Sequence, residues 1–445
     1  MLAGERTTYR RSRMLPALLG AVALFAPAAG FAQESLVTPE VIGVRDAPIT
    51  ISMQPRFAYS HQSNDPARGK VLTEAFDSWI HRHPEVRLDI LVQQGDDAVI
   101  VAKRIEDANA GRAADVIMVE QPDYQKFYDL TESFSPYLSD ADVADFLPGI
   151  RSGMQDPDSG EIKYLQITAY TFGLWYRKDL VETPPTSLEE LSEVAAQLVA
   201  DEGFRYGVFV LGGQAIDRLT LLSQVASIGG QIVADDADST PVFGEGANRD
   251  ALIRVLSWYK EQVDKGIMPT DVVNFAATGD VVSRVAAAEM PFVLGGSFMG
   301  GGIAQTPEGD KWAFAPMPQL DGAEPVMYQS GWAWGMFTED PVKQALITDL
   351  LMDTYIGPWA MAAWGEAGGY TPTRASSLQN YAAFISDTPA RSFAEALKTA
   401  IPLPNGTHSA LVASAITTAF QQVILGTLTP EQAVDEAWTT VQLEI

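Results

Sequence analysis

Four histidines are the side chains of this sequence best suited to bind a metal ion or to carry a proton: His61, His81, His83 and His408. Only His81 and His83 are neighbours, in the segment WIHRHP. A zinc site needs several converging ligands, and no carboxylate follows this pair at zinc-ligand spacing. We therefore interpret both as surface residues and predict no metal site. The chain has no cysteine, which excludes disulfides, thiolate metal sites and cysteine nucleophiles.

Paired carboxylates are the other groups with catalytic potential, because two acids can flank a glycosidic bond. Asp96-Asp97, Glu189-Glu190 and Asp235-Asp236 are such pairs. With 57 acidic residues in the chain, however, neighbouring acids arise by chance. The Gly-x-Ser-x-Gly motif of serine hydrolases is absent from the sequence. We expect a protein that is not an enzyme and that uses no cofactor.

A glycine-rich segment, GGSFMGGG at residues 295–302, follows an apolar strand pattern and raises the question of phosphate binding. It lacks the P-loop lysine and the Gly-x-Gly-x-x-Gly spacing of nucleotide sites. Glycine also serves wherever backbones approach closely. Two interpretations stay open: a backbone turn that faces a ligand, and a purely structural turn.

Aromatic residues at predicted strand ends and in loops are the more informative group: Tyr59, Tyr124, Tyr170, Trp175, Phe298, Trp332, Trp334 and Tyr370. Ligands of open α/β sheets bind outside the carboxyl ends of the strands. Aromatic faces stack on sugar rings, while amide, carboxylate and arginine groups bond to the hydroxyls. An interior role is an equal alternative, because aromatic residues also dominate protein cores.

The elements that must position these residues alternate between strand and helix. Strands are predicted at residues 49–53, 86–92 and 115–119, with helices at 71–80 and 97–109. This order is typical of an α/β domain with a mainly parallel sheet.

A second α/β unit is predicted from Tyr164 onward, where an apolar strand pattern is broken by Pro184-Pro185 and followed by a helix. Thr186 and Ser187 each stand three residues before a glutamate, so either can form the capping box of this helix. Strand and helix patterns then alternate to the C-terminus. We expect Trp175, on the apolar strand, to be a core residue.

The first 32 residues have the pattern of a signal peptide, with four arginines, an apolar run at 15–29 and small residues before Gln33. The run is too short for a comfortable membrane span. We expect export and cleavage after Ala32, without a lipid anchor, to a periplasm. Removing the four arginines and Glu5 (net +3) takes the formal charge from −27 to about −30. So acidic a chain is unsuited to binding nucleic acid.

Seven segments, read in order, resemble the family 1 extracellular solute-binding proteins of bacterial ABC importers, the group that contains the maltose-binding protein. They are AKRIEDANAGRAADVIMVE, GLWYRKDLVETPPTSLEEL, AAAEMPFVLGGSF, FAPMPQLDG, SGWAWGMF, GGYTPTR and LGTLTPEQAVDEAW. Each motif is weak alone, but their order and spacing together are specific. The resemblance extends over nearly all of residues 49–441.

The resemblance implies a two-lobed periplasmic-binding-protein fold of type II, with a mixed, mainly parallel sheet flanked by helices in each lobe. The expected lobes are 33–168 with 330–375, and 169–329 with 376–445. Hinge crossings are expected near 166–171, near 328–331 and after Arg374. A solute held between the lobes drives closure, and the closed protein delivers it to the membrane permease. We expect a monomer.

Ligand-binding residues are carried over from the family by position. They are Tyr59, His61, Glu120, Gln121, Tyr124, Tyr170, Gly296, Ser297, Phe298, Trp332, Trp334, Tyr370, Arg374, Asn405 and His408. We expect one of Trp332 and Trp334 to pack inward. The aromatic and amide-rich loops favour a carbohydrate: a sugar, an oligosaccharide or a polyol glycoside.

Three alternatives remain at this stage. A cationic solute such as a polyamine is suggested by the acidity and by Glu120. An anionic sugar is suggested by Arg56, His61 and Arg374. A secreted glycan-cleaving enzyme would need two carboxylates about 5–9.5 Å apart, and no acid pair here has a catalytic setting.

Overall fold

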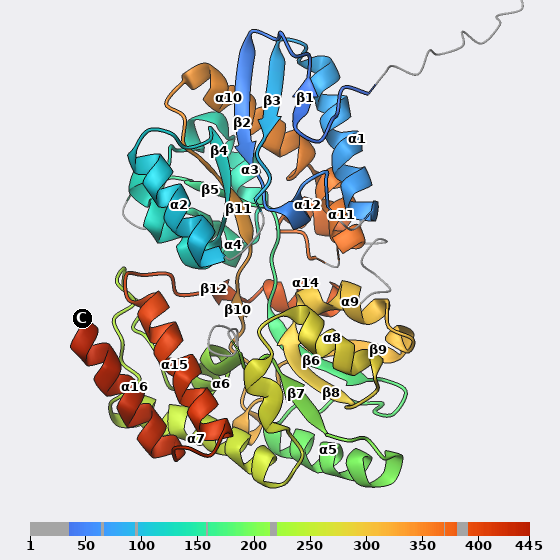
Figure 1. Ribbon diagram of the computed structural model, residues 1–445, viewed down its shortest axis with the longest axis vertical. Coiled ribbons are helices and arrows are strands. Elements are labelled where there is room, and N and C mark those ends of the chain that lie inside the picture. The colour runs from blue at the N-terminus through green and yellow to red at the C-terminus, as the bar shows by residue number, and fades with distance from the viewer. Residues whose placement is uncertain are drawn as a thin grey trace, which may run out of the picture. The chain divides into compact units, whose positions relative to one another are not determined.

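The computed structural model describes residues 35–63, 66–93, 97–156, 159–213, 220–368, 370–380 and 390–445. The predicted signal peptide lies outside these residues. Two main β-sheets, each flanked by helices, account for most of the described chain (Figure 1). None of the helices in these ranges has both the length and the apolar character needed to cross a bilayer.

The first sheet has six strands in the order β1-β3-β2-β4-β11-β5. Their bounds are β1 (Val41–Gly43), β2 (Ile49–Gln54), β3 (Val86–Ile90), β4 (Val116–Glu120), β5 (Tyr164–Gln166) and β11 (Trp332–Met336). The three strands predicted for this region are confirmed, each within one or two residues. Buried residues alternate with less buried ones in β3, as in Val86, Leu88 and Ile90, whereas β4 is buried along its first four residues, and both patterns are clear in the sequence.

The second sheet has four strands in the order β7-β8-β6-β9. Their bounds are β6 (Phe172–Arg177), β7 (Val208–Val210), β8 (Phe292–Gly296) and β9 (Trp312–Pro316). Strand β8 is buried along its whole length. A separate two-stranded pair joins β10 (Tyr328–Gln329) to β12 (Ile401–Pro402) in parallel.

Parallel pairing is less common than the sequence predicts. In the first sheet β2 pairs in parallel with β3 and β4, whereas β1, β11 and β5 run antiparallel to their neighbours. In the second sheet only β7 and β8 are parallel. Both sheets are mixed, as expected, but the expected predominance of parallel strands is wrong for the described residues. One cause is β11, which comes from late in the chain and runs against β4.

The helices around the first sheet include α1 and α2, which match the predicted helices. Their bounds are α1 (Pro66–Arg82), α2 (Asp97–Asn109), α3 (Asp140–Asp145), α4 (Pro148–Met154), α10 (Pro341–Thr354), α11 (Pro358–Gly368) and α12 (Ala375–Asn380). Short 3-10 helices follow several strands: η1 (Phe57–Tyr59), η2 (Gln121–Leu130) and η3 (Ser135–Tyr137). Helix α1 packs against α10 and α11 and buries Phe76 and Trp79.

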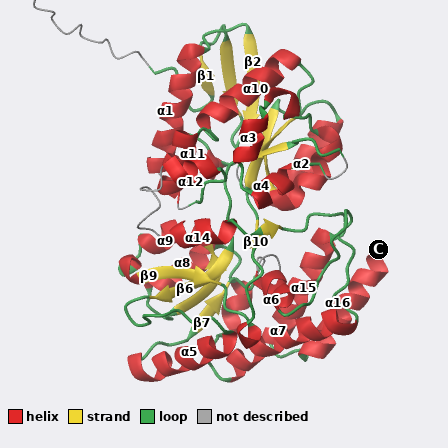
Figure 2. Cartoon of the chain, turned by 180° about the vertical axis from the view of Figure 1, so that it is seen from behind, coloured by secondary structure: helices red, strands yellow, loops and turns green. Residues whose placement is uncertain are grey.

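The second sheet is flanked by the remaining helices (Figure 2). The longer ones are α5 (Leu188–Glu202), α7 (Gly246–Asp264), α8 (Thr278–Ala286), α14 (Ala390–Leu397), α15 (Ser409–Ile424) and α16 (Pro430–Glu444). The shorter ones are α6 (Leu222–Ser227), α9 (Gly300–Ala304), η5 (Thr270–Asn274), η6 (Ser297–Met299), η7 (Gly309–Lys311) and η8 (Leu320–Gly322). Helices α15 and α16 pack on each other and on α7.

Ser187 caps helix α5, which decides between the two predicted capping boxes. Its Oγ accepts a hydrogen bond from the backbone N–H of Glu190 at 3.0 Å. The carboxylate of Glu190 reaches back one residue further and accepts from the N–H of Thr186 at 3.0 Å. The helix therefore begins at Leu188, one residue after the cap.

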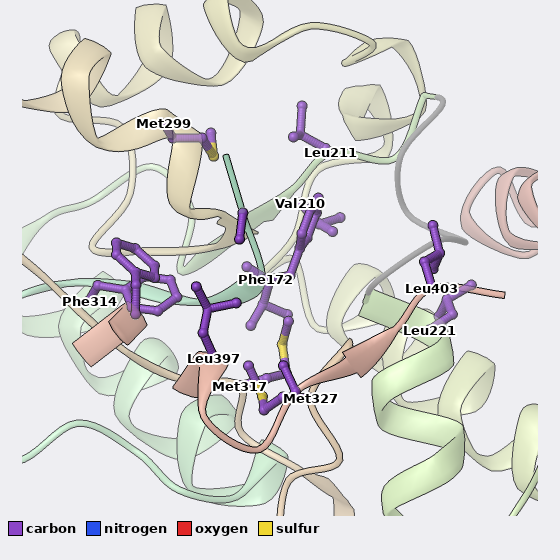
Figure 3. Packing of buried hydrophobic residues seen from close by; sticks show 14 of the residues in the cluster. Phe172, Val210, Leu211, Leu221, Met299, Phe314, Met317, Met327, Leu397 and Leu403 are labelled. Atoms are coloured by element: carbon purple, nitrogen blue, oxygen red, sulfur yellow. The ribbon is translucent and has the colours of Figure 1, made fainter. Parts of the chain in front are cut away.

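Trp175 is a core residue, as predicted from its place on an apolar strand. It is 1% exposed, and its indole N–H donates to the Gly296 carbonyl at 3.0 Å. The surrounding core includes side chains from distant segments, among them Phe314, Met317, Met327 and Leu397 (Figure 3). The strand order of the second sheet is thus supported by packing from segments late in the chain.

The chain passes from the first sheet to the second between Gln166 and Phe172 and returns before Trp332. These two connections lie side by side, because Tyr170 and Ser330 form an antiparallel bridge. A third segment joins them through the bridge of Ala169 with Thr371. The boundaries given above for the two lobes stay a prediction.

Candidate functional site

Four aromatic rings form a cluster beside the carboxyl end of β2. Tyr59, in η1, has its ring centroid 5.6 Å from Trp332, 5.2 Å from Trp364 and 5.6 Å from Tyr370. Trp364 and Tyr370 are also stacked, at 5.7 Å. Tyr59 and Trp364 are buried, whereas Trp332 and Tyr370 are only partly buried. The structure therefore brings together three predicted site residues, Tyr59, Trp332 and Tyr370, around the unpredicted Trp364.

Two guanidinium groups lie over this aromatic cluster. The guanidinium carbon of Arg56 lies 5.7 Å from the Trp332 ring centroid. That of Arg68 lies 5.3 Å from the Tyr370 centroid and 5.8 Å from the Trp364 centroid. Guanidinium and aromatic faces attract each other at such distances. The rings and cations thus orient one another.

The phenol of Tyr59 stays protonated in this setting. Burial, followed by the charge and hydrogen bond of the Tyr370 hydroxyl, raises the pKa of Tyr59 well above its usual value, although Arg68 acts in the opposite direction. Tyr59 is therefore neutral at physiological pH, and its backbone carbonyl accepts a hydrogen bond from Tyr355 at 2.9 Å.

A second group links the ends of strands in the two sheets. Glu120 ends β4 and is the register partner of Trp332 on β11. Tyr170, between β5 and β6, donates its hydroxyl to Glu120 Oε1 at 2.5 Å. The Tyr170 ring meets Phe298 edge to face, with centroids 5.4 Å apart and planes at 89°. Glu120, Tyr170, Phe298 and Trp332 thus form one connected set, and all four are partly exposed.

The first two residues of the glycine-rich segment end β8, and the rest form two short helices, η6 and α9, rather than one turn. Gly296 has a structural reason for its identity, because an added Cβ would lie 2.1 Å from the Phe298 ring. The backbone N–H of Ser297 donates to the Thr171 carbonyl at 2.9 Å. The Ser297 hydroxyl is buried and has no hydrogen-bond partner within the described ranges. Close packing of Phe298 on this backbone therefore places the ring beside Tyr170.

Asn405 and His408 lie just before helix α15. The backbone N–H of His408 donates to the Asp238 carbonyl at 2.9 Å, which anchors the start of the helix. Burial raises the pKa of Tyr128 to about 12, and a hydrogen bond with the Asn405 side chain acts in the opposite direction. Asn405 therefore contacts η2, which follows Glu120.

A cavity of about 120 Å³ lies beside these residues. Its wall on η2 includes Asp123 and Lys126, whose carboxylate and ammonium groups are 2.6 Å apart. The complete lining is Pro122, Asp123, Lys126, Leu222, Ile232, Val233, Leu403, Pro404, Ser409, Ala410, Val412, Ala413 and Ile416. The predicted loops after Glu120 and around Asn405 therefore border one hollow, which is mostly apolar with a charged rim.

Gln121 and Tyr124, two predicted site residues, belong to the interior, and Tyr124 is removed from the candidate site. Both are fully buried. The Tyr124 ring stacks on Tyr164 at 3.9 Å and 13°. Burial raises the pKa of Tyr124 well above its usual value. The prediction failed because the 3-10 helix η2 folds this ring back beneath the sheet.

Trp334 is also an interior residue, which confirms that one of the two tryptophans packs inward. It is fully buried against Tyr355, with ring centroids 5.2 Å apart. Trp332 and Trp334 are two residues apart and share one face of β11. Their position along the strand separates them: Trp332 is the first residue of β11 and is partly exposed, whereas Trp334 is the third.

Arg374 has a structural role, contrary to its prediction as a site residue. It is 6% exposed, and its guanidinium donates to Asp145 at 2.6 Å and to Asp142 at 3.3 Å. Burial acts to raise the pKa of Asp145, but hydrogen bonds from Ser376 and Arg374 outweigh it and hold that pKa below its usual value. Arg374 is therefore committed to two carboxylates.

The His61 side chain contacts the backbone of the segment around Thr38. Its Nε2 lies 3.0 Å from the Thr38 carbonyl. Burial lowers the pKa of His61, although the carbonyls of Thr38 and Pro39 act in the opposite direction. It is therefore mainly neutral at pH 7, which removes a second group expected to bind an anionic sugar. Groups of three or more acids or histidines placed to hold a metal ion do not occur among the described residues.

Trp364 and Arg68 are the contributors that sequence reasoning missed. Trp364 lies on a largely apolar helix, α11, six residues before Tyr370, and Arg68 is in the first turn of α1. The nearness of Trp364 to Tyr370 in sequence was the available signal. Nothing in the sequence indicated that α1 and α11 pack together, as they do.

The structure has two mixed sheets with helices, and the adjacent crossings between them carry the connected aromatic and polar set. This arrangement is the two-lobed fold of solute-binding proteins. A family model described as bacterial extracellular solute-binding protein matches residues 83–393. The chain belongs to this family.

Solved structures support the same fold. The GacH receptor of Streptomyces glaucescens GLA.O, studied unliganded and with acarbose, is 18% identical with a TM-score of 0.72, covering 89% of this chain and 97% of that one. Maltose-bound MalE3 of T. maritima is 18% identical with a TM-score of 0.72, and the match covers 89% of this chain and 100% of that one. The sugar-binding protein MalE of Xanthomonas citri is 18% identical with a TM-score of 0.72, and the match covers 88% of this chain and 96% of that one. These similarities show a two-lobed α/β fold.

Proposed function

We propose that this solute-binding protein captures a carbohydrate between its two lobes and delivers it to the membrane permease of an ABC importer. In this proposal residues 1–32 direct export to the periplasm and are removed. The lobes are 33–168 with 330–375, and 169–329 with 376–445. Ligand that contacts both lobes favours the closed arrangement, because it gains contacts only there.

The observation that carries the proposal is the connected set Glu120, Tyr170, Phe298 and Trp332, in which Trp332 packs against the buried ring of Tyr59. Partly exposed aromatic rings give flat apolar surfaces of the kind that pack on the C–H faces of a pyranose. The Glu120 carboxylate and the Tyr170 hydroxyl lie between these rings and can bond to sugar hydroxyls. Of the solved structures named above, the GacH receptor was studied with acarbose, MalE3 is maltose-bound, and MalE of Xanthomonas citri is a sugar-binding protein, which supports this ligand class.

A cationic ligand such as a polyamine is less well supported. Arg56 and Arg68 already lie over Trp332 and Tyr370. A second cation on these rings would meet like charge, which is unfavourable. An anionic sugar loses His61 and Arg374 as contacts, for the reasons given above. Catalysis has no support from the family, whose members are binding proteins.

The test is to titrate the purified mature protein with a panel of neutral sugars, including maltose, maltotetraose and acarbose, and with spermidine and uronic acids. Thermal unfolding and tryptophan fluorescence are the readouts. A ligand at 100 times its Kd stabilises the folded state by about 2.7 kcal/mol. We expect a carbohydrate to raise the melting temperature. A shift with spermidine alone would replace this proposal with the cationic one, and release of reducing sugar from glycans would indicate an enzyme.

A further inference from the structure

The cavity beside helix α15 differs in chemistry from the aromatic and polar set that carries the proposed function. Its described lining residues are apolar apart from Asp123, Lys126 and Ser409, and none of them is aromatic. A pyranose ring placed there would leave most of its hydroxyls without hydrogen-bond partners, which is unfavourable. The cavity is therefore unsuited to a sugar ring.

Hydrogen bonds between three segments hold the walls of this cavity. Gln125, in η2, donates its Nε2 to the Ala237 carbonyl at 3.1 Å. The backbone N–H of His408 donates to the carbonyl of the next residue, Asp238, at 2.9 Å. The loop at 237–238 thus connects η2 to the segment before α15, and the cavity lies between segments that are bonded to one another.

The size and burial of the cavity fit one compact apolar group. Its volume is about 120 Å³, and an apolar cavity of about 150 Å³ in another protein binds benzene. Four of its lining residues are buried: Ile232, Leu403, Val412 and Ile416. Lys126 and Ala410 also line it and are exposed, so the cavity is open to solvent on their side.

The polar groups of the cavity favour a neutral occupant. The carboxylate of Asp123 and the ammonium group of Lys126 pair with each other at 2.6 Å, so an ion gains little by entering. The Ser409 hydroxyl is buried and has no hydrogen-bond partner within the described ranges. It can donate to an ether oxygen at the edge of an otherwise apolar group.

The cavity also lies close to the connected set. Pro122, one of its lining residues, comes two positions after Glu120. Their Cα atoms are therefore at most about 7 Å apart. A molecule that contacts the Glu120 carboxylate is thus within reach of the cavity.

We infer that the ligand is a glycoside with a small apolar aglycone, about the size of a phenyl ring, and that this cavity binds the aglycone. The sugar contacts the connected set, and the Ser409 hydroxyl donates to an oxygen of the ligand. This inference rests on the proposed function, because it assigns a chemical class to the same ligand. Since η2 and α15 belong to different predicted lobes, the aglycone contacts both of them.

The first experiment compares the methyl and phenyl glycosides of glucose, galactose and maltose by calorimetry with the mature protein. Burying a group of this size removes enough apolar surface from water to increase affinity by at least about 10-fold. We therefore expect the phenyl glycoside of a sugar that binds to have an affinity at least about 10-fold above that of its methyl glycoside. Equal affinities would overturn the inference.

A variant with a smaller cavity shows whether the phenyl ring binds there or on another apolar surface. Ala413→Leu places three more carbon atoms in the cavity wall. The ratio of phenyl to methyl affinity should then fall below about 2. Ala200→Leu, the same substitution at an exposed position of α5, is the control and should keep the wild-type ratio. A folded Ala413→Leu protein that keeps the preference for phenyl would contradict the inference.

Xenon provides a readout that needs no sugar, because this gas occupies apolar cavities of such a size. Crystals of the wild-type protein under xenon pressure should show a xenon atom next to Ile232, Leu403 and Ile416. Absence of xenon from the cavity would overturn the inference. This test and the wild-type affinity ratio remain decisive if Ala413→Leu does not fold, which its thermal unfolding reveals.

The outcomes separate this inference from the proposed function. If methyl and phenyl glycosides bind alike, the carbohydrate function stands and the aglycone site is wrong. If no sugar and no glycoside binds, the proposed function fails and the inference fails with it.

Discussion

The hydroxyl of Tyr170 lies 2.5 Å from Oε1 of Glu120, a residue fifty positions earlier in the chain. Tyr170 belongs to the crossing from the first sheet to the second, and Glu120 is the last residue of β4. The same tyrosine ring touches Phe298 at the end of β8. One side chain therefore connects strand ends of both sheets and fixes the orientation of a carboxylate between aromatic rings.

Removing this hydroxyl should weaken ligand binding more than it weakens the fold. In Tyr170→Phe the ring contact with Phe298 is kept, but Glu120 loses a hydrogen bond of the charged type, worth about 1.5–3 kcal/mol. We expect about a 10-fold loss in carbohydrate affinity by calorimetry. Tyr176→Phe, at a partly buried tyrosine of β6 outside the connected set, is the control and should bind normally. An unchanged affinity in Tyr170→Phe would show that Glu120 orientation is irrelevant.

Trp332 should be the main stacking surface for the ligand. Replacing it with alanine removes a large ring at the edge of the aromatic cluster, and truncation of such residues costs about 2 kcal/mol or more in binding. We expect at least a 30-fold loss in affinity and loss of the ligand-induced fluorescence change. Trp359→Ala is the matched control, because Trp359 is 47% exposed on α11. If both variants bind alike, the aromatic cluster is not the binding surface.

Arg374 should matter for stability rather than for ligand charge. Arg374→Leu leaves Asp142 and Asp145 without their buried partner, and breaking such a pair costs about 3–5 kcal/mol. Urea denaturation should show this loss. Arg254→Leu breaks an exposed pair with Asp321, 2.6 Å apart, and should cost less than about 1 kcal/mol. Equal effects of the two substitutions would contradict the structural role.

The pH dependence of stability should reveal Asp145. Its pKa is depressed in the folded protein, so its contribution is fully present above the unfolded value of about 3.9 and is lost as pH falls through the folded value. The difference in melting temperature between wild type and Asp145→Asn should therefore be constant from pH 7 to about 5 and shrink below about pH 4. Asp140→Asn, which changes an exposed acid of the same helix, is the control variant. A difference that stays constant down to pH 3 would contradict the assignment.

Local sequence patterns were sufficient to predict features that depend on a single helix or strand. Helix α2 and the strands β2, β3 and β4 were predicted because their apolar periodicity is strong and each buries one face or the whole strand. The inward position of Trp175 followed from the same reasoning. The antiparallel pairing of β11 with β4 and β5 was not predicted. The direction of β11 depends on the path of the 160 or more residues that separate it from β5.

Side-chain roles were harder to predict when a distant partner decides them. The sequence around Arg374 predicts an exposed cation after a turn, but its partners Asp142 and Asp145 lie about 230 positions earlier in the chain. The sequence around Tyr124 predicts an aromatic residue in a loop, and its burial depends on Tyr164, forty positions later in the chain. Tyr59, Trp332 and Tyr370 were each predicted from the sequence as candidate site residues, but the contacts of Tyr59 with the other two rings became visible only in three dimensions.

The position of β11 between β4 and β5 has a consequence for how the protein is made. β5 joins the first sheet only through β11 among the described strands, and β11 is synthesised about 165 residues after β5. Folding that depends on such distant contacts is slow. The first sheet therefore stays incomplete until most of the chain has left the ribosome.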